Sequence, residues 1–229
     1  MENHYKNFPA FYHAVDCVIF GFEKCCIKLL LVHRIHHPNK GKWSMIGDFV
    51  KEGESLDEAA QRIVHDLTGL DNVFLEQLHT FSDPGRDPGG RVLSTAYYAL
   101  LKITEYDKQR TKSKNAKWFE LDQIPPLIFD HKEMLHCALK RVRQKNRYRP
   151  IGIELLPEKF TIPQLQKLYE SIYEKTFDNA NFRKKILSYG FLKRLDEKDR
   201  NDSKRGAFYY IFDKKKLRER TDESLFFLM

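Results

Sequence analysis

The sequence predicts an α+β protein with two domains, an α/β/α sandwich in residues 1–148 and a winged helix-turn-helix in residues 149–229. The chain of 229 residues is longer than a usual domain of about 100–200 residues. Patterns of strands, helix, strands and helix follow one another in its first part. Residues 1–145 hold 21 Lys or Arg and 19 Asp or Glu (net +2), whereas residues 146–229 hold 19 and 13 (net +6). This asymmetry favours an acidic partner such as nucleic acid for the second domain.

Two strands joined by a hairpin connection open the first domain. Residues 13–20 alternate and are rich in β-branched side chains, residues 27–32 form a short apolar run, and residues 21–26 connect them. Asp16 lies among the apolar residues of the first strand. A carboxylate there faces either solvent or a pocket, and we favour a pocket because this face should adjoin the loop at Trp43.

A loop with three histidines, His33, His36 and His37, follows the second strand. Histidines can bind metals, but no cysteine or carboxylate completes a tetrahedral set at the usual spacing. We therefore expect a solvated loop here and predict no metal site.

The stretch from Trp43 to Leu70 specifies a loop, a capped helix and a stop. Ser55 and Glu58 form a capping box, and Gly69 is placed to end the helix in a left-handed conformation. Apolar residues recur at helical spacing between them, at Leu56, Ala59, Ala60, Ile63, Val64 and Leu67. Taken alone, this pattern fits any surface helix that packs on a core.

Two further strands, in residues 74–81 and 92–103, flank a segment rich in Pro and Gly, residues 82–91. This segment is either a plain hairpin loop or a ligand-binding loop. Arg86 and Arg91 would give such a loop bidentate donors for a phosphate or carboxylate. The domain closes with a helix that starts at Asp130, where Glu133 completes a second predicted capping box.

The second domain contains two short helices joined by a tight turn, as in a helix-turn-helix. A short strand is expected in residues 151–156. The first helix starts at a capping box of Thr161 and Gln164, and residues 174–178 separate it from a second helix capped by Asp178 and stopped by Gly190. Two apolar strands, residues 191–195 and 207–212, surround a polar connection that resembles a wing.

The second of these helices has the composition of a DNA-recognition helix. Residues 179–188 carry three basic side chains and no acidic one, and such outward side chains can reach base edges or phosphates. The alternative is a solvated charged face, which is ordinarily commoner. The wing has nearly balanced charges, so its cations are weaker candidates. The predicted DNA contacts are Asn181, Arg183, Lys184, Lys185, Ser188, Arg200, Lys204 and Arg205.

The cysteines, Cys17, Cys25, Cys26 and Cys137, have no framework spacing and no paired CxxC motif, which favours reduced thiols over disulfides. No signal-peptide pattern and no apolar run of membrane-spanning length is present. We therefore expect a cytoplasmic protein without a membrane partner.

The stretch from Trp43 to Leu70 resembles the Nudix box, G-x5-E-x7-R-E-U-x-E-E-x-G-U, where U is bulky and apolar. Glu54, Arg62, Val64, Gly69 and Leu70 match its frame. In Nudix hydrolases three glutamates of this helix bind divalent cations that activate water. Those positions here hold Ile63, Asp66 and Leu67, and the opening glycine is Asp48. The resemblance therefore implies a retained Nudix architecture with lost catalysis, and we assign no catalytic residue, metal or cofactor.

The whole chain is similar to the Nudix-related transcriptional regulators, the NrtR family and its sugar-responsive AraR relatives. The run FSDPGRDPGGRVLSTAYYAL, the box without its glutamates, and IFDHKEML before a basic module carry this similarity. It implies a Nudix-like α/β/α sandwich that binds an effector, a winged helix-turn-helix that binds double-stranded operator DNA, and a homodimer. We therefore expect a repressor that places two recognition helices on a pseudo-palindrome.

The effector pocket is expected to combine aromatic faces with hydrogen-bonding groups. Aromatic stacking with paired polar contacts suits a pentose, whereas arginines without metal suit a dinucleotide or ADP-ribose. Asp48 adds negative charge where phosphates would lie, so we favour a neutral sugar over ADP-ribose. The resemblance to the AraR regulators implies that this sugar is L-arabinose. The residues expected to line the pocket are Asp16, Arg34, Trp43, Asp48, Phe81, Arg86, Tyr97 and His131.

Two other functions fit parts of the pattern. The chain could be an active Nudix hydrolase that uses Asp66 and Glu54 with an atypical metal site, acting on a nucleoside diphosphate derivative. It could also be an RNA-binding module on the same fold, which a preference for single strands over a palindromic duplex would reveal.

Overall fold

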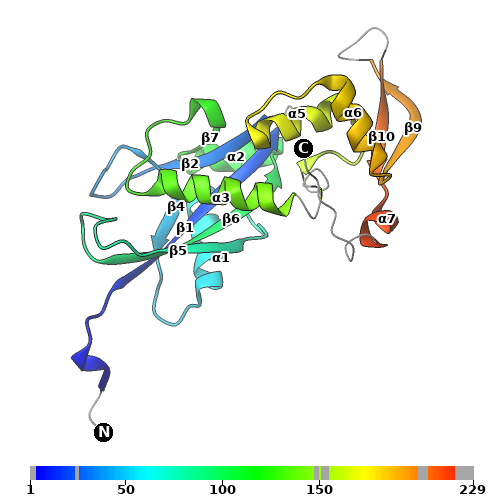
Figure 1. Cartoon of the computed structure of the whole chain (residues 1–229). Helices are drawn as coiled ribbons and strands as arrows, with labels where there is room; N and C mark the ends of the chain where they lie inside the picture. Colours follow the sequence, from blue (N-terminus) through cyan, green and yellow to red (C-terminus); the bar gives the residue numbers. More distant parts are fainter. Residues whose placement is uncertain (1–3, 24–25, 147–149, 151–154, 201–205, 220–229) are drawn as a thin grey trace. The chain divides into compact units, whose positions relative to one another are not determined.

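The computed structural model describes all residues except 1–3, 24–25, 147–149, 151–154, 201–205 and 220–229 (Figure 1). The chain divides into two compact units. The first comprises residues 1–19, 29–99 and 105–138, and the second comprises residues 20–28, 100–104 and 139–229. The boundary predicted between residues 148 and 149 falls among residues outside this description and stays a prediction.

Residues between 12 and 120 form a mixed sheet of seven strands. The strands follow the order β3-β2-β1-β6-β5, with β4 paired to β1 and β7 paired to β2. Their bounds are Tyr12–Glu23 (β1), Cys26–His33 (β2), Trp43–Ser44 (β3), Ile46–Phe49 (β4), Glu76–Phe81 (β5), Val92–Lys102 (β6) and Ala116–Glu120 (β7). The predicted strands are confirmed, but β1 runs on to Glu23, so the connection to β2 is shorter than the expected residues 21–26.

Helices cover both faces of this sheet. Asp16 of β1 contacts Ser94 of β6 and faces helix α3 (His131–Lys145), whereas Tyr97 of β6 donates a hydrogen bond to Asp57 of helix α1 (Leu56–Thr68). Side chains alternate between the faces of a strand, so Ser94 and Tyr97 point to opposite sides. The two helices therefore lie on opposite faces, which confirms the predicted α/β/α sandwich.

Helix α1 has the ends that its sequence predicts. The Ser55 hydroxyl accepts the amide of Glu58, the Glu58 carboxylate accepts the amide of Ser55 at 2.8 Å, and Gly69 ends the helix with φ of 73°. Ala59, Ala60, Ile63 and Val64 are buried on its inner face. Burying a side chain the size of Ile or Val contributes about 1.5–3 kcal/mol, which fixes the helix against the sheet.

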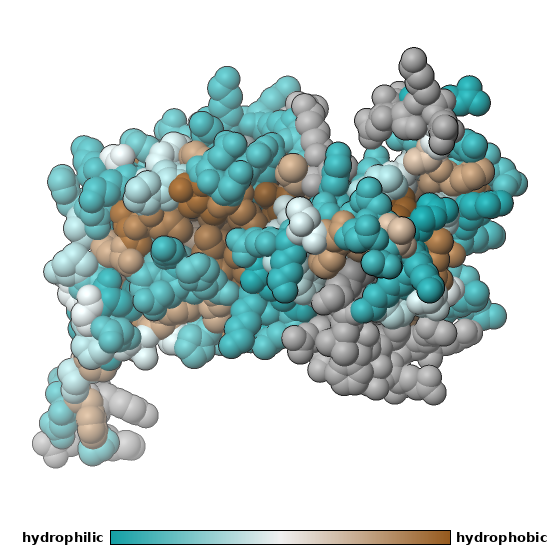
Figure 2. Space-filling model, turned by 45° about the horizontal axis from the view of Figure 1, so that its top comes forward, coloured by the Kyte–Doolittle hydropathy of each residue, from teal (hydrophilic) through white to brown (hydrophobic). Residues whose placement is uncertain are grey.

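Some short elements were not predicted. Helix α2 (Glu105–Ser113), the 3-10 turns η1 (His4–Asn7) and η2 (Leu121–Gln123), and helix α7 (Lys214–Glu219) lack an amphipathic pattern long enough to read. The segment with η1 projects away from the sheet (Figure 1), and Phe8 and Phe11 beyond it are 60% and 48% exposed. Figure 2 shows apolar side chains on this segment and a larger apolar area framed by hydrophilic residues on the sheet-bearing part.

The C-terminal elements of the second unit form a winged helix. Helix α5 (Ile162–Tyr173) starts at the predicted capping box of Thr161 and Gln164, and helix α6 (Asn179–Ser188) starts at Asp178. Strands β8 (Phe160–Thr161), β10 (Ala207–Phe212) and β9 (Leu192–Asp199) pair in that order. The core between the helices and this sheet is formed by Leu165, Leu168, Tyr169, Ile172, Phe182, Ile186, Phe191 and Tyr210.

The wing differs from the prediction. Strand β9 continues to Asp199, although a polar connection was expected from residue 196, because pairing with β10 extends over polar residues. Of the strand expected in residues 151–156, residues 151–154 fall outside the described residues, and Leu155 is helical rather than extended. Lys204 and Arg205 also fall outside the described residues. In the part of the chain that the structure describes, no helix is long and apolar enough to cross a membrane.

Candidate functional site

A buried polar cluster lies between β1, β6 and the start of α3. It consists of Asp16, Arg86, Ser94, Asp130 and His131, and we call it the buried cluster. The Ser94 hydroxyl donates to the Asp16 carboxylate at 2.6 Å, and His131 Nε2 lies 3.6 Å from the other Asp16 oxygen. Asp16 is 7% exposed and His131 is 2% exposed, so this carboxylate depends on its protein partners for solvation.

Arg86 is held almost completely by carboxylates. Its Nε and one terminal nitrogen donate to the two oxygens of Asp130 at 2.8 and 2.7 Å, and it lies 3.7 Å from Asp16. A bidentate pair of this kind fixes both groups in orientation. The Asp130 carboxylate, expected to cap α3, thus anchors the loop of residues 82–91 to the start of that helix. Arg86 is a positioning residue here, not an exposed donor.

His131 is neutral in this environment. Its Nδ1 lies 3.1 Å from the backbone amide of Met45, which must donate, so the ring proton is on Nε2 and faces Asp16. Burial lowers the pKa of His131 from its ordinary value of 6.5, although the charges of Asp16 and Asp130 oppose the shift. The buried cluster therefore contains one cation and two carboxylates.

Strand β4 approaches Asp16 so closely that only glycine fits beside it. Gly47 pairs with Asp16 across β1 and β4, and a Cβ atom at this position would lie 2.0 Å from the Asp16 carboxylate oxygen. The glycine next to the box thus makes room for the buried carboxylate, a role that the sequence did not reveal.

Arg34 is a half-buried cation that adjoins the buried cluster through Phe129. Its guanidinium lies over the ring of Phe129 at 5.4 Å, and Phe129 packs edge-on to His131. Within the described residues its hydrogen bonds run only from Nε, to the carbonyls of His36 at 3.2 Å and Pro38 at 2.7 Å. Its terminal nitrogens are therefore available to an anionic ligand.

Trp43 belongs to an aromatic group at the other end of the same loop. Its ring is edge-on to His33 at 5.2 Å and to Phe119 at 4.9 Å, and Lys117 lies over the Phe119 ring. Trp43 and Phe119 are half-buried. Half-buried aromatic rings beside cations are well suited to stack on a base or sugar.

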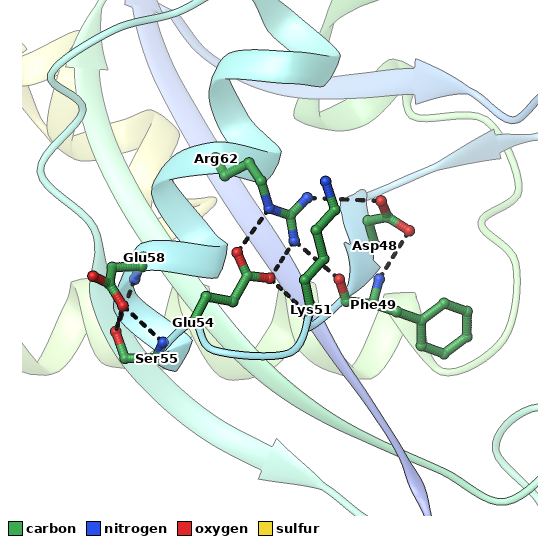
Figure 3. Close-up of polar contacts among 7 residues, drawn as sticks. All are labelled: Asp48, Phe49, Lys51, Glu54, Ser55, Glu58 and Arg62. Carbon is green, nitrogen blue, oxygen red and sulfur yellow. Dashed lines mark hydrogen bonds and ion pairs between the residues drawn. The ribbon is translucent and has the colours of Figure 1, made fainter.

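The box loop is held by an ion pair between Arg62 and Glu54 (Figure 3). Arg62 of α1 donates from Nε to Glu54 at 2.8 Å and from a terminal nitrogen to the carbonyl of Phe49 at 3.0 Å. This pairing lowers the pKa of Glu54 to about 2. Asp48 is exposed, accepts the amide of Phe49 at 2.8 Å and lies 3.9 Å from Arg62. Its charge is thus partly balanced by Arg62, which removes our physical reason for preferring an uncharged effector.

The three positions that carry glutamates in a Nudix hydrolase differ in exposure. Ile63 is fully buried, Leu67 is half-buried, and Asp66 has 51% of its side chain exposed beside His65. Ile63, a core residue, thus stands where a hydrolase has a metal-binding glutamate. Hard cations need several oxygen ligands at fixed geometry, so this helix offers a poor metal site.

The structure brings together only part of the predicted effector set. Asp16, Arg86 and His131 meet in the buried cluster, and Arg34 adjoins it through Phe129. Tyr97 is on the opposite face of the sheet, with its hydroxyl on Asp57, and Phe81 packs edge-on to His79 at the end of β5. Sequence reasoning missed Ser94, Asp130 and Phe129. Strand alternation could have placed Ser94 with Asp16, but no pattern indicated the other two.

Helix α6 presents the predicted basic face. Asn181, Arg183, Lys184, Lys185 and Ser188 are all exposed, whereas Phe182 and Ile186 are buried. Arg183 donates to the Tyr210 hydroxyl at 3.3 Å, and the Ser188 hydroxyl donates to the carbonyl of Lys185 at 2.7 Å. The exposure of Asn181, Lys184 and Lys185 agrees with the expectation, and their contact with DNA stays a prediction.

The wing strand β9 adds cations that sequence reasoning missed. Arg194 and Lys198 lie over the ring of Phe208 at 4.6 and 4.5 Å, and both are exposed, as are Lys193 and Arg200. The extension of β9 to Asp199 produces this arrangement, because Lys198 pairs directly with Phe208 of β10.

Two family models match the chain. A NUDIX domain matches residues 11–137, and the NrtR DNA-binding winged helix domain matches residues 152–212. The ADPR responsive transcriptional repressor NtrR of Acinetobacter baylyi is 31% identical over 211 residues, which cover 90% of this chain and 84% of the relative.

Solved structures show the same organisation. Shewanella oneidensis NrtR complexed with a 27mer DNA superposes with a TM-score of 0.71 at 29% identity, over 90% of this chain and 95% of that one. The NUDIX domain of that protein complexed with ADP ribose gives 0.53 at 30% identity, over 62% of this chain and 94% of that one. From its fold, its two matched domains and these relatives, the chain belongs to the NrtR family of Nudix-related transcriptional regulators.

Proposed function

We propose that this chain is a DNA-binding repressor whose Nudix domain binds ADP-ribose without hydrolysing it. The observation that carries the proposal is the conversion of the box helix: Ile63 is fully buried and Leu67 is half-buried at positions where a hydrolase has metal ligands. The domain retains its architecture and has lost the ligands that would hold a diphosphate-cleaving metal cluster.

ADP-ribose is favoured over L-arabinose. The Acinetobacter relative is named as ADPR responsive, and a related Nudix domain has been crystallised with ADP ribose, while none of these comparisons supports an arabinose effector. The charge argument for a neutral sugar also fails, since Asp48 lies close to Arg62.

Arg34 is the proposed contact for the diphosphate. Arg86 is buried and already donates two hydrogen bonds to Asp130. Binding a phosphate through Arg86 would require breaking this buried ion pair, which is unfavourable. Arg34 has free terminal nitrogens and planar geometry suited to phosphate oxygens. The half-buried rings of Trp43 and Phe119 would stack on the base or ribose.

The DNA-binding form is proposed to be a homodimer. Two copies of α6 would enter successive major grooves, about 34 Å apart, on a pseudo-palindromic operator. Asn181 would reach base edges, and Lys184 and Lys185 would contact phosphates or bases. ADP-ribose can regulate such a complex only if it has different affinities for the conformation of the dimer that binds DNA and for the conformation that does not.

Calorimetry tests the ligand assignment. ADP-ribose titrated into the full-length chain without divalent metal should bind, whereas L-arabinose should not. Arg34→Ala should weaken ADP-ribose binding by about 1.5–3 kcal/mol, the range for a hydrogen bond to a charged group. Lys112→Ala, at an exposed cation on α2, serves as the control. Binding of arabinose but not ADP-ribose would reverse the assignment.

An active hydrolase is the second candidate, because Asp66 is exposed and Glu54 is retained. Incubation of ADP-ribose and other nucleoside diphosphate sugars with Mg²⁺ or Mn²⁺ distinguishes the two functions. Metal-dependent turnover that Asp66→Ala abolishes would establish the hydrolase and defeat the noncatalytic proposal.

A further inference from the structure

Helix α3 begins in the buried cluster, and its last turn contacts helix α5 of the winged helix. His131 is its first residue, and Arg143 lies in its last turn. At 1.5 Å per residue the two are about 18 Å apart along the helix axis. His131 and Arg143 thus belong to one continuous helix, His131 in the first unit and Arg143 in the second.

The far end of α3 is attached to the end of α5. Arg143 donates from Nε to the carbonyl of Ile172 at 2.7 Å, and one terminal nitrogen is paired with the Glu174 carboxylate. The carbonyls in the last turn of a helix lack partners within the helix and carry partial negative charge. A guanidinium at this point therefore satisfies α5 and neutralises its C-terminus in the same contact.

A buried amide reinforces this attachment. Asn146 follows α3, is fully buried, and donates from Nδ2 to the hydroxyl of Tyr173 at 3.1 Å. Tyr173 is the last residue of α5. Two side chains, Arg143 and Asn146, thus join the end of α3 to the end of α5.

Residues 174–178, which follow the contact with Arg143, form the turn that determines the orientation of helix α6. Glu174 ends α5 in the left-handed conformation, with φ of 51° and ψ of 43°, and residues 174–178 lead directly into α6. This conformation is unusual for a residue other than glycine and persists only where its surroundings hold it. The ion pair with Arg143 is one such restraint.

We propose that α3 couples the effector site to DNA recognition and that Arg143 is the positioning residue through which it acts on the helix-turn-helix. The inference rests on the proposed function, because it assumes that a ligand binds near His131 and Arg34. Ligand contacts at the start of α3 would change the position of α5 and the turn at Glu174, and with them the orientation of α6.

The test measures two quantities in the full-length chain, the effect of ADP-ribose on duplex affinity and the affinity for ADP-ribose itself. The probe is a fluorescent duplex that the wild-type chain selects from a random pool, and its Kd is measured by anisotropy with and without saturating ADP-ribose. The ratio of these two values is the coupling factor, typically about 5–150 in regulated proteins. Calorimetry gives the Kd for ADP-ribose separately.

Arg143→Ala should reduce the coupling factor by about 2- to 30-fold, the range found for residues on coupling routes, and leave the Kd for ADP-ribose unchanged. Glu174→Gln, which removes only the charge of the partner, should reduce it in the same direction with less risk to folding. Lys140→Ala changes an exposed cation on α3 and should leave the coupling factor at the wild-type value.

Two results would overturn the inference. One is an unchanged coupling factor in both Arg143→Ala and Glu174→Gln. The other is loss of coupling in Ser171→Ala alone, since Ser171 contacts the amide of Ile27 at 3.1 Å and would indicate a route through the β1–β2 hairpin. If the wild-type chain does not bind ADP-ribose, the proposed function is wrong. If it binds ADP-ribose but the variants keep the wild-type coupling factor, only the inference about Arg143 is wrong.

Discussion

His131 and Asp16 face each other across 3.6 Å inside the sheet-bearing unit, with the second imidazole nitrogen on the backbone amide of Met45. This arrangement ties the start of α3 to the centre of β1 and to the loop at the box. It requires a neutral imidazole, since burial lowers the pKa of His131. The stability of the fold should therefore depend on pH.

The chain should become less stable as the pH falls from 7.5 to 5.5. In the unfolded chain His131 binds a proton near pH 6.5, whereas in the folded chain its lowered pKa prevents this, so acid favours unfolding. One such proton contributes at most about 1.4 kcal/mol per pH unit. His131→Asn can still accept the Met45 amide and should flatten the pH profile of urea unfolding, unlike His136→Asn at an exposed position of α3. A profile equally steep in both variants would contradict this role.

Gly47→Ala should destabilise the fold by about 1–3 kcal/mol, the usual cost of overpacking. The new methyl group would overlap the Asp16 carboxylate. The double variant with Asp16→Ala should therefore lose less stability than the sum of the two single variants. Chemical denaturation of the two single variants and the double variant measures this interaction. Gly85→Ala, where an added Cβ meets Asp83 at an ordinary 3.4 Å, is the control. Strict additivity of Gly47→Ala and Asp16→Ala would argue against the clash.

Replacing Ile63 by the glutamate of a hydrolase should lower the stability of the fold. Ile63→Glu would place an unpaired carboxylate in a fully buried position, at a cost on the order of 3–5 kcal/mol. Leu67→Glu, at a half-buried position of the same helix, should cost about 1 kcal/mol, which is typical of point substitutions. Thermal melting compares the two. If Ile63→Glu is tolerated and confers metal binding, the box helix has kept more of the hydrolase site than we propose.

Lys184→Ala should weaken duplex binding while ADP-ribose binding stays unchanged. Loss of one phosphate contact lowers the slope of log K against log salt by about 0.9. Anisotropy titrations between low and moderate salt measure this slope, with Lys132→Ala as a control at an exposed cation on α3. An unaltered affinity and slope would mean that α6 does not carry the DNA contact.

The sequence predicts those elements whose specification is local. The capping boxes at Ser55 and Thr161 and the glycine stop at Gly69 identified α1 and α5 within a residue or two, because caps and apolar periodicity are read over short windows. Helix α2 was missed because its highly polar sequence gives no periodic signal. Strand β8 is two residues long and forms only because β10 pairs with it.

The candidate site was predicted only in part, because its contacts are long-range. Alternation could indicate that Asp16 faces inward, and it does. Nothing local shows that Asp130 would pair with Arg86 and so remove it from ligand binding, or that Tyr97 would be directed to Asp57 on the opposite face. The preference for arabinose depended on the charge of Asp48, and its proximity to Arg62 becomes visible only in three dimensions.

The central claim, a Nudix domain that senses ADP-ribose without cleaving it, is tested most directly by one titration. ADP-ribose is added, with Mg²⁺ present, to the full-length chain bound to its selected duplex, while anisotropy follows the DNA and chromatography follows the nucleotide. We predict a change in duplex affinity of at least about fivefold with the ADP-ribose recovered intact. Conversion of ADP-ribose to AMP, or an affinity for DNA that ADP-ribose leaves unchanged, would contradict the account.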